Sequence, residues 1–159
     1  MRVCMDTSMD CSVLGPCLPS VDQIAEACFE RLEAEVEAGG AVGDAHLLQL
    51  HHLYGKNWVN ALRLVDDCGV TCYVAQPSGR TAFRVKGKAA GDHYSVFPRH
   101  FCSCQAFFYE VVCKSDALCC KHQLAARLAV LTNNCSTVTV SDEAMAGMLM
   151  QSFGQDSAH

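Results

Sequence analysis

The feature that most constrains this sequence is a run of candidate metal ligands between residues 102 and 122. The segment CSCQAFFYEVVCKSDALCCKH holds five cysteines and one histidine. Thiolates and imidazoles are the ligands that zinc prefers, and a structural zinc site takes four ligands in a tetrahedron. The segment therefore predicts a metal-centred fold, provided that four of its six candidates have a suitable spacing.

Two short pairs have that spacing. Cys102 and Cys104 are separated by one residue, so on a strand both sulfurs project from the same face. Cys120 and His122 have the same gap where a loop enters a predicted helix. The 15 residues between the pairs close a loop at modest entropic cost. We therefore predict that Cys102, Cys104, Cys120 and His122 hold one structural zinc ion.

The other candidates in this segment have weaker spacing. Cys119 is adjacent to Cys120 but lacks the one-residue gap to His122, and Cys113 lies within a short predicted helix. We interpret both as core or spare thiols. His100 is near enough to Cys102 to be a rival ligand. The alternatives to a zinc site are buried free thiols or a disulfide.

The chain has 159 residues and twelve cysteines, and half of its residues are apolar. This composition suits one globular domain with a core of its own. The N-terminal stretch shows no secretory signal pattern, so the cysteines indicate a reducing compartment rather than a disulfide framework. No apolar run approaches the ~20 residues of a membrane-spanning helix, so we expect no membrane association.

The net charge of −5 is unevenly distributed. Residues 1–79 carry a net charge of −7, residues 80–127 a net charge of +5, and residues 128–159 a net charge of −3. The whole chain is thus a poor electrostatic match to DNA, although its middle segment is not. A solvated basic face on the metal module is the simpler interpretation of that segment.

Hydrophobic periodicity predicts three helices before the metal module. Ser20 and Gln23 have the spacing of a capping box, and Val21, Ile24, Cys28, Leu32 and Val36 recur at helical spacing until Gly39 and Gly40. A second helix is expected from Asp44 to Tyr54. A third follows Gly55 and contains Trp58, which is expected to anchor the core.

The period then changes to that of strands. VTCYVAQ and TAFRVKG, joined by PSGR, predict a β-hairpin, and DHYSVF predicts a third strand. After the cysteine segment, KHQLAARLAVL predicts a helix, STVTV a short strand, and Ser141 the start of a last helix with Met145, Met148 and Leu149 on one face.

The predicted fold class is α+β: N-terminal helices, a small antiparallel sheet that carries a zinc-stapled hairpin and helix, and a C-terminal helix. Four regions follow along one compact domain. They are a flexible leader (1–19), a helical region (20–69), the hairpin with the zinc module (70–134), and a strand, helix and tail (135–159).

The pattern of two closely spaced ligand pairs resembles that of the SWIM zinc-finger family. The resemblance rests on Cys-x-Cys, on the aromatic AFFYE that follows it, and on Cys-x-His at the start of a helix. Beyond the finger, LYGKNWVNALRLVDDCGVTCYVAQ and VTVSDEAMAGMLM are similar to the solitary SWIM subunits of Shu-type complexes. This similarity runs from about Val21 to Ser152 and leaves out the leader.

The resemblance implies a non-enzymatic subunit for homologous recombination in the nucleus. Such subunits form a heterodimer with a RecA-like recombinase paralogue and help the recombinase filament assemble on single-stranded DNA, in double-strand-break repair and in meiosis. In this sequence, the residues carried over are the zinc ligands Cys102, Cys104, Cys120 and His122. Nothing in the periodicity or composition indicates recombination by itself.

Two other classes stay open. One is a SWIM protein of the transposase or transcription type that binds DNA directly through the basic run of Arg80, Arg84, Lys86, Lys88 and Arg99, with Phe83, Tyr94 and Phe97 between them. The other is a zinc enzyme or a ubiquitin-ligase adaptor. The sequence lacks a glycine-rich phosphate loop and the usual zinc-hydrolase motifs, and it offers one zinc site where a RING fold needs two.

Overall fold

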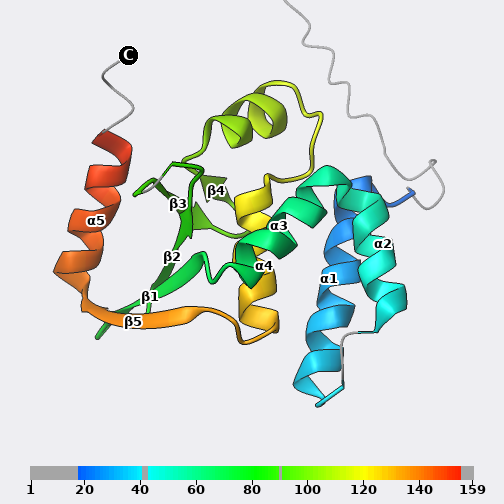
Figure 1. Ribbon diagram of the computed structural model, residues 1–159, viewed down its shortest axis with the longest axis horizontal. Coiled ribbons are helices and arrows are strands. Elements are labelled where there is room, and N and C mark those ends of the chain that lie inside the picture. The colour runs from blue at the N-terminus through cyan, green and yellow to red at the C-terminus, as the bar shows by residue number, and fades with distance from the viewer. Residues whose placement is uncertain (1–17, 41–42, 90, 155–159) are drawn as a thin grey trace, which may run out of the picture.

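The computed structural model describes residues 18–40, 43–89 and 91–154. The predicted leader therefore lies outside the described residues except for its last two. The elements run in the order α1 (Val21–Glu37), α2 (Asp44–Tyr54), α3 (Lys56–Asp66), β1 (Val70–Gln76), β2 (Thr81–Lys86), β3 (His93–Phe97), β4 (Phe101–Cys102), the π-helix η2 (Phe107–Cys113), α4 (Lys121–Leu131), β5 (Ser136–Ser141) and α5 (Asp142–Gly154). Figure 1 shows the sheet between α5 on one side and α1 to α4 on the other, with η2 above it. None of the described helices is both long and apolar enough to cross a bilayer.

The first helix begins at the predicted capping box. The Ser20 N–H donates to Gln23 Oε1 at 2.8 Å, and the Gln23 N–H donates to Ser20 Oγ at 3.3 Å. The buried face of α1 consists of Ala25, Phe29 and Leu32. This differs from the predicted face, because Val21 and Ile24 are exposed. The Phe29 ring sets the orientation, since it packs edge-on against Tyr54 and Trp58.

Helices α2 and α3 meet at a single residue, Gly55, which ends one helix and precedes the other. Its φ of 52° lies in the left-handed region, where a side chain would be strained. The sharp turn brings Trp58 into the core, where its side chain is 2% exposed. The predicted core anchor is therefore confirmed.

The sheet has five strands in the order β4-β3-β2-β1-β5. Strands β1 to β4 pair antiparallel, as predicted for the hairpin and the strand after it. The last strand, β5, lies parallel to β1 with Thr71 opposite Ser136. The chain leaves β4 at one edge of the sheet, passes through α4, and adds β5 at the opposite edge, beside β1. The α+β class is confirmed, but the sheet is mixed rather than purely antiparallel.

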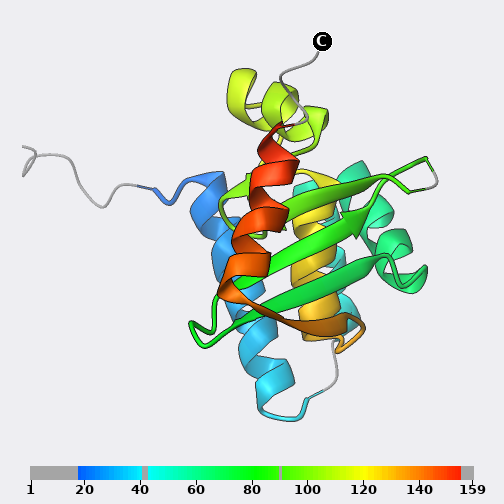
Figure 2. The same cartoon turned by 90° about the vertical axis from the view of Figure 1, so that its left-hand side faces the viewer.

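The two faces of the sheet are covered by different helices. Helix α4 lies against one face, with α3 and α1 packed around it, and its Leu124, Ala125 and Leu128 are at most 2% exposed. The other face is crossed by α5, whose Met145 packs against Ala75 and Ala82. Figure 2 shows this layered arrangement. Helix α4 is thus the centre of the larger core, and α5 covers a smaller one.

A charged network attaches α1 to α4. Both terminal nitrogens of Arg127 donate to the Glu26 carboxylate, at 2.8 and 3.1 Å, and one of them also reaches Glu33 at 3.3 Å. The guanidinium lies 3.8 Å from the centre of the Phe29 ring. The Arg127 side chain is only 10% exposed, so water screens these contacts weakly. Much of the acidic charge on this side of α1 is balanced within the fold.

Arg99 joins the same network from the turn after β3. Its Nη2 lies 3.0 Å from Glu26 and 3.5 Å from Glu33. The sequence grouped Arg99 with the basic residues of β2 as part of one basic run. That grouping is wrong, because Arg99 contacts acidic partners on α1 that are distant in the sequence.

Replacing Arg127 by alanine should lower the free energy of unfolding by about 2 kcal/mol, because two carboxylates lose the more buried of their two arginine partners and the Phe29 ring loses its covering cation. Denaturant titration of the zinc-loaded protein measures this change. Arg99→Ala is the matched control: its side chain is 49% exposed, so its loss should cost less than about 1 kcal/mol. Equal losses for the two variants would contradict the structural role given to Arg127.

Candidate metal centre

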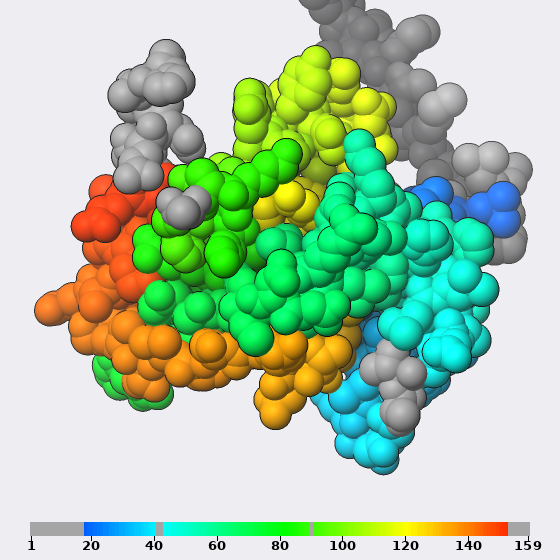
Figure 3. Space-filling model, viewed as in Figure 1, coloured from blue at the N-terminus to red at the C-terminus, as the bar shows by residue number. Residues whose placement is uncertain are grey.

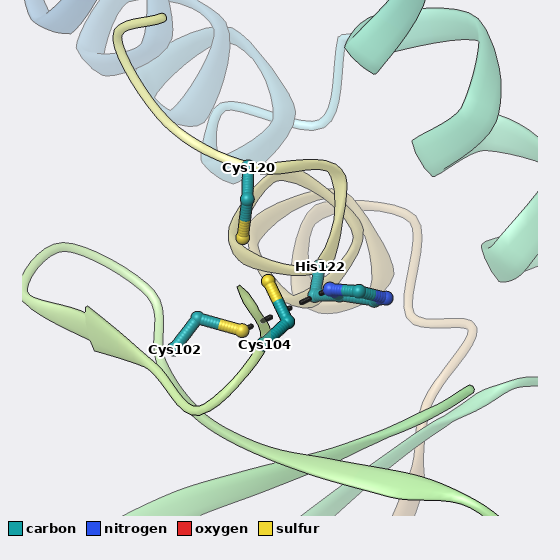
Figure 4. Close-up of side chains that lie close together, drawn as sticks. All are labelled: Cys102, Cys104, Cys120 and His122. Carbon is teal, nitrogen blue, oxygen red and sulfur yellow. Dashed lines mark hydrogen bonds between the residues drawn. The ribbon is translucent and has the colours of Figure 1, made fainter. Parts of the chain in front are cut away.

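Four side chains from two distant segments meet where the β4 edge of the sheet faces the start of α4. Ligand atoms of Cys102, Cys104, Cys120 and His122 all lie within 4.8 Å of one another. Figure 4 shows the three sulfurs gathered together, with one end of the His122 ring beside them. Each of these residues is at most 3% exposed. The structure therefore gathers the four residues that the spacing singled out.

The first pair is positioned by the short strand β4. Cys102 ends β4 and lies opposite Val96 of β3. The next residue, Ser103, donates its N–H to Ser95 O and accepts the Ser95 N–H on its Oγ, each at 3.0 Å. The predicted strand through Cys104 is therefore shorter than expected. Cys104 lies in a bend, where its sulfur accepts the Phe107 N–H at 3.3 Å and so holds the start of η2.

The second pair is positioned by the N-terminus of α4. Cys120 is the N-cap residue, and its N–H donates to Gln123 Oε1 at 3.1 Å. His122 lies in the first turn of the helix. The backbone N–H groups and the dipole at a helix N-terminus favour negative charge, so this position stabilises a thiolate. Sequence reasoning missed the role of Gln123, although it has the same three-residue spacing from Cys120 that Gln23 has from Ser20.

The three thiols perturb one another strongly. Hydrogen bonds from Cys102 and Cys120 hold the pKa of Cys104 far below its ordinary value. The pKa of Cys102 is raised because it donates to these neighbours and is buried. The hydrogen bond from Cys102 lowers the pKa of Cys120, but donation to Cys104 and burial outweigh it and raise that pKa to about 12. Without a cation, the cluster therefore favours one thiolate among three sulfurs, whereas a divalent ion would stabilise all three as thiolates.

The environment of His122 gives an independent test of whether a metal fits. Its Nδ1 lies 3.8 Å from Cys102 Sγ, and its Nε2 is buried with no hydrogen-bond partner among the described residues. The ring packs against Tyr94 with 4.5 Å between the ring centres. The nitrogen that faces the sulfurs, Nδ1, has only this long contact to a thiol, and ligation to a metal through Nδ1 would give it a strong partner. Three sulfurs and one imidazole suit tetrahedral zinc.

The remaining candidate ligands lie outside this cluster. Cys113 is exposed at the end of η2, and His100 is exposed on the turn before β4. Cys119 is half-buried, and burial raises its pKa to about 12, which keeps it a neutral thiol. Its backbone carbonyl accepts a hydrogen bond from Asn57 Nδ2 at 3.1 Å. The cysteines that the structure describes are all free thiols.

The basic residues predicted for DNA binding are divided by the fold. Arg80, Arg84, Lys86 and Lys88 lie along β2 and its two flanking turns, and none makes an ion pair within the described part of the chain. The aromatic residues between them belong to the packed interior instead. Phe83 is 7% exposed, Tyr94 packs against the larger core, and Phe97 packs beneath α5. The predicted alternation of charges and stacking rings is therefore absent from this surface.

Comparison with known proteins places this arrangement in a family. The chain is 35% identical over 132 residues to Zinc finger SWIM domain-containing protein 7 of Mus musculus, which covers 83% of this chain and 86% of that protein. The protein of the same name from Homo sapiens is 32% identical over 134 residues, or 84% of this chain and 95% of its own length. The Danio rerio protein is 36% identical over 131 residues, or 82% of this chain and 92% of its own length.

The chain belongs to the zinc finger SWIM domain-containing protein 7 family. No family profile and no solved structure matches it. Family membership and the buried cluster agree, since a SWIM protein 7 homologue is expected to hold one structural zinc ion, and the cluster offers the donors for it. When bound, the ion would neutralise the buried thiolates and hold the β4 edge of the sheet against α4.

Replacing Cys120 by serine should abolish stoichiometric zinc binding and unfold much of the region from residue 100 to 130. Metal binding supplies about 10–16 kcal/mol of apparent folding free energy in small zinc modules. Elemental analysis and circular dichroism of the purified chain measure both effects. Cys119→Ser is the matched control and should retain zinc. Loss of zinc from the Cys119 variant instead would show that the ligands are assigned in the wrong register.

Proposed function

We propose that this protein is a non-enzymatic subunit of a Shu-type complex, in which Cys102, Cys104, Cys120 and His122 ligate one structural zinc ion. In this proposal it forms a heterodimer with a RecA-like recombinase paralogue in the nucleus. The heterodimer supports assembly of the recombinase filament on single-stranded DNA during homologous recombination. The observation that carries the proposal is the similarity to SWIM protein 7 relatives over more than four fifths of the chain.

The donor set supports a structural rather than a catalytic metal. A catalytic zinc usually has three protein ligands and keeps a position for water. Here four strong donors converge, and each is at most 3% exposed. Four protein ligands would leave no position for a substrate, so the site favours a role in holding the fold together.

Apolar surface that the fold leaves exposed supports a stable protein partner. Helix η2 has the sequence FFYEVVC, yet none of its residues is buried. Phe108 is 63% exposed, Tyr109 54% and Val112 56%. This helix projects from the molecule at the top of Figure 3, in yellow-green. Neighbouring apolar side chains without cover commonly mark a protein interface.

The helices differ in how much surface they leave for a partner. Seven of the eleven residues of α4 are buried, so this helix belongs to the core. On α5, Met145 is buried against the sheet, while Met150 is 73% exposed. The exposed part of α5, the exposed residues of α1 and the helix η2 remain available to a partner.

Co-expression with a RecA-like paralogue from the same genome should give a 1:1 complex that survives gel filtration. The chain expressed alone should aggregate or self-associate in light scattering, because η2 is then uncovered. A chain that behaves as a monodisperse monomer and co-purifies with none of the paralogues would contradict the proposal, even with zinc present in stoichiometric amount.

An alternative to the Shu-type function is that the protein binds single-stranded DNA directly, and the unpaired basic residues of β2 favour it. Arg84 and Lys86 project from the same face of β2, and neither makes an ion pair within the described residues. Reversing both to glutamate should weaken DNA binding and flatten its dependence on salt, whether DNA binds the lone chain or the heterodimer. The matched control reverses Arg31 and Arg63, which are exposed on α1 and α3. Equal salt slopes for the two double variants would exclude this contact.

A further inference from the structure

Strand β5 forms an open edge of the sheet. It pairs with β1 on one side and ends the strand order on the other, so its outer backbone groups have no strand partner among the described residues. Figures 1 and 2 show it along the lower edge of the sheet. Of its six residues only Val140 is partly buried, and the others are exposed. By contrast, the opposite edge strand, β4, has two residues and leads directly into the metal cluster.

The sequence of β5 lacks the features that usually protect an edge strand. Natural edges are blunted by charged residues, proline, bulges or short length. The segment STVTVS is uncharged, contains no proline or glycine, and alternates valine with small hydroxyl residues. Val138 is 39% exposed on the face that α5 partly covers. Such a strand is suited to pairing with another extended segment.

Acidic residues surround both ends of this edge. Asp142 and Glu143 follow β5 directly. At the other end, Asn134 is bonded to the last turn of α3, where its Nδ2 donates to Val65 O at 3.0 Å. That contact places exposed Asp66 and Asp67 near the start of β5. No basic residue follows Arg127 in the sequence, and Arg80, which lines the same cavity as Asp142, makes no ion pair with it.

This charge pattern argues against a second copy of the chain as the occupant. Antiparallel pairing of two β5 strands would place Asp142 and Glu143 of each copy near Asp66 and Asp67 of the other. Parallel pairing would bring identical acidic ends together. Either arrangement juxtaposes like charges, which disfavours the complex. A segment from a different protein with basic residues at its ends would be attracted instead.

We propose that the outer edge of β5 docks an extended segment of the partner protein as a sixth strand. The occupant has an uncharged, β-branched or apolar middle and Lys or Arg residues at its ends. This inference rests on the proposed heterodimer, because the RecA-like paralogue supplies the segment. Main-chain hydrogen bonds provide the attachment, and the acidic ends of the edge select a basic partner over self-association.

Hydrogen exchange of the lone chain and of the zinc-loaded heterodimer tests the docking directly. Amides of residues 136–141 that exchange rapidly in the lone chain should exchange at least about tenfold more slowly in the complex, since they become hydrogen-bonded.

A second measurement uses the double variant Asp67→Lys with Glu143→Lys. It should lower the association rate constant about tenfold at low salt, and the difference should shrink as salt is raised.

The matched control is Asp44→Lys with Asp92→Lys. These residues are exposed on α2 and just before β3, and Asp44 occupies the first turn of its helix as Glu143 does. This variant has the same net charge but should associate nearly as the parent does. A complex in which β5 amides exchange as in the lone chain would overturn the docking site and leave the heterodimer standing. Protection of β5 amides in a homodimer would show that the edge pairs with a second copy of this chain and not with a partner segment. Failure to form any heterodimer would overturn both proposals.

Discussion

The position of α4 against the edge of the sheet is the constraint on which the rest of the structure depends. Its N-cap and first turn carry two of the four clustered side chains, and the other two lie at the end of β4 and in the bend after it. The same helix fills the larger core with Leu124 and Leu128 and binds α1 through Arg127. Holding one end of α4 therefore positions the sheet, the N-terminal helices and the crossover to β5 together.

Charge within this protein is paired across elements rather than along them. The acidic helix α1 faces two arginines from separate parts of the finger region, which balance Glu26 and Glu33. The basic residues of β2 and the acidic residues around β5 have no such partners among the described residues. This uneven balance explains how an acidic chain can present one basic and one acidic surface, each suited to a different contact.

A structural metal has a clear physical use in a chain of this size. Much of the segment from β4 to α4 is short strand, bend and π-helix, which bury little apolar surface of their own. Metal ligation would supply the free energy that such a segment lacks. That stabilisation would allow η2 to keep its apolar side chains at the surface, where a partner can reach them, instead of using them to build a core.

The sequence by itself determined the features that depend on neighbouring residues. The capping box at Ser20, the limits of α4, the β1–β2 hairpin and the spacing of the four clustered side chains all follow from local patterns, because caps, turns and short chelating pairs involve residues a few positions apart. Only the tertiary structure decided the parallel pairing of β5, the contact of Arg99 with α1, the burial of α4 and the exposure of η2. Each of these depends on which distant segments meet, and hydrophobic periodicity shows that a face is apolar without showing what covers it.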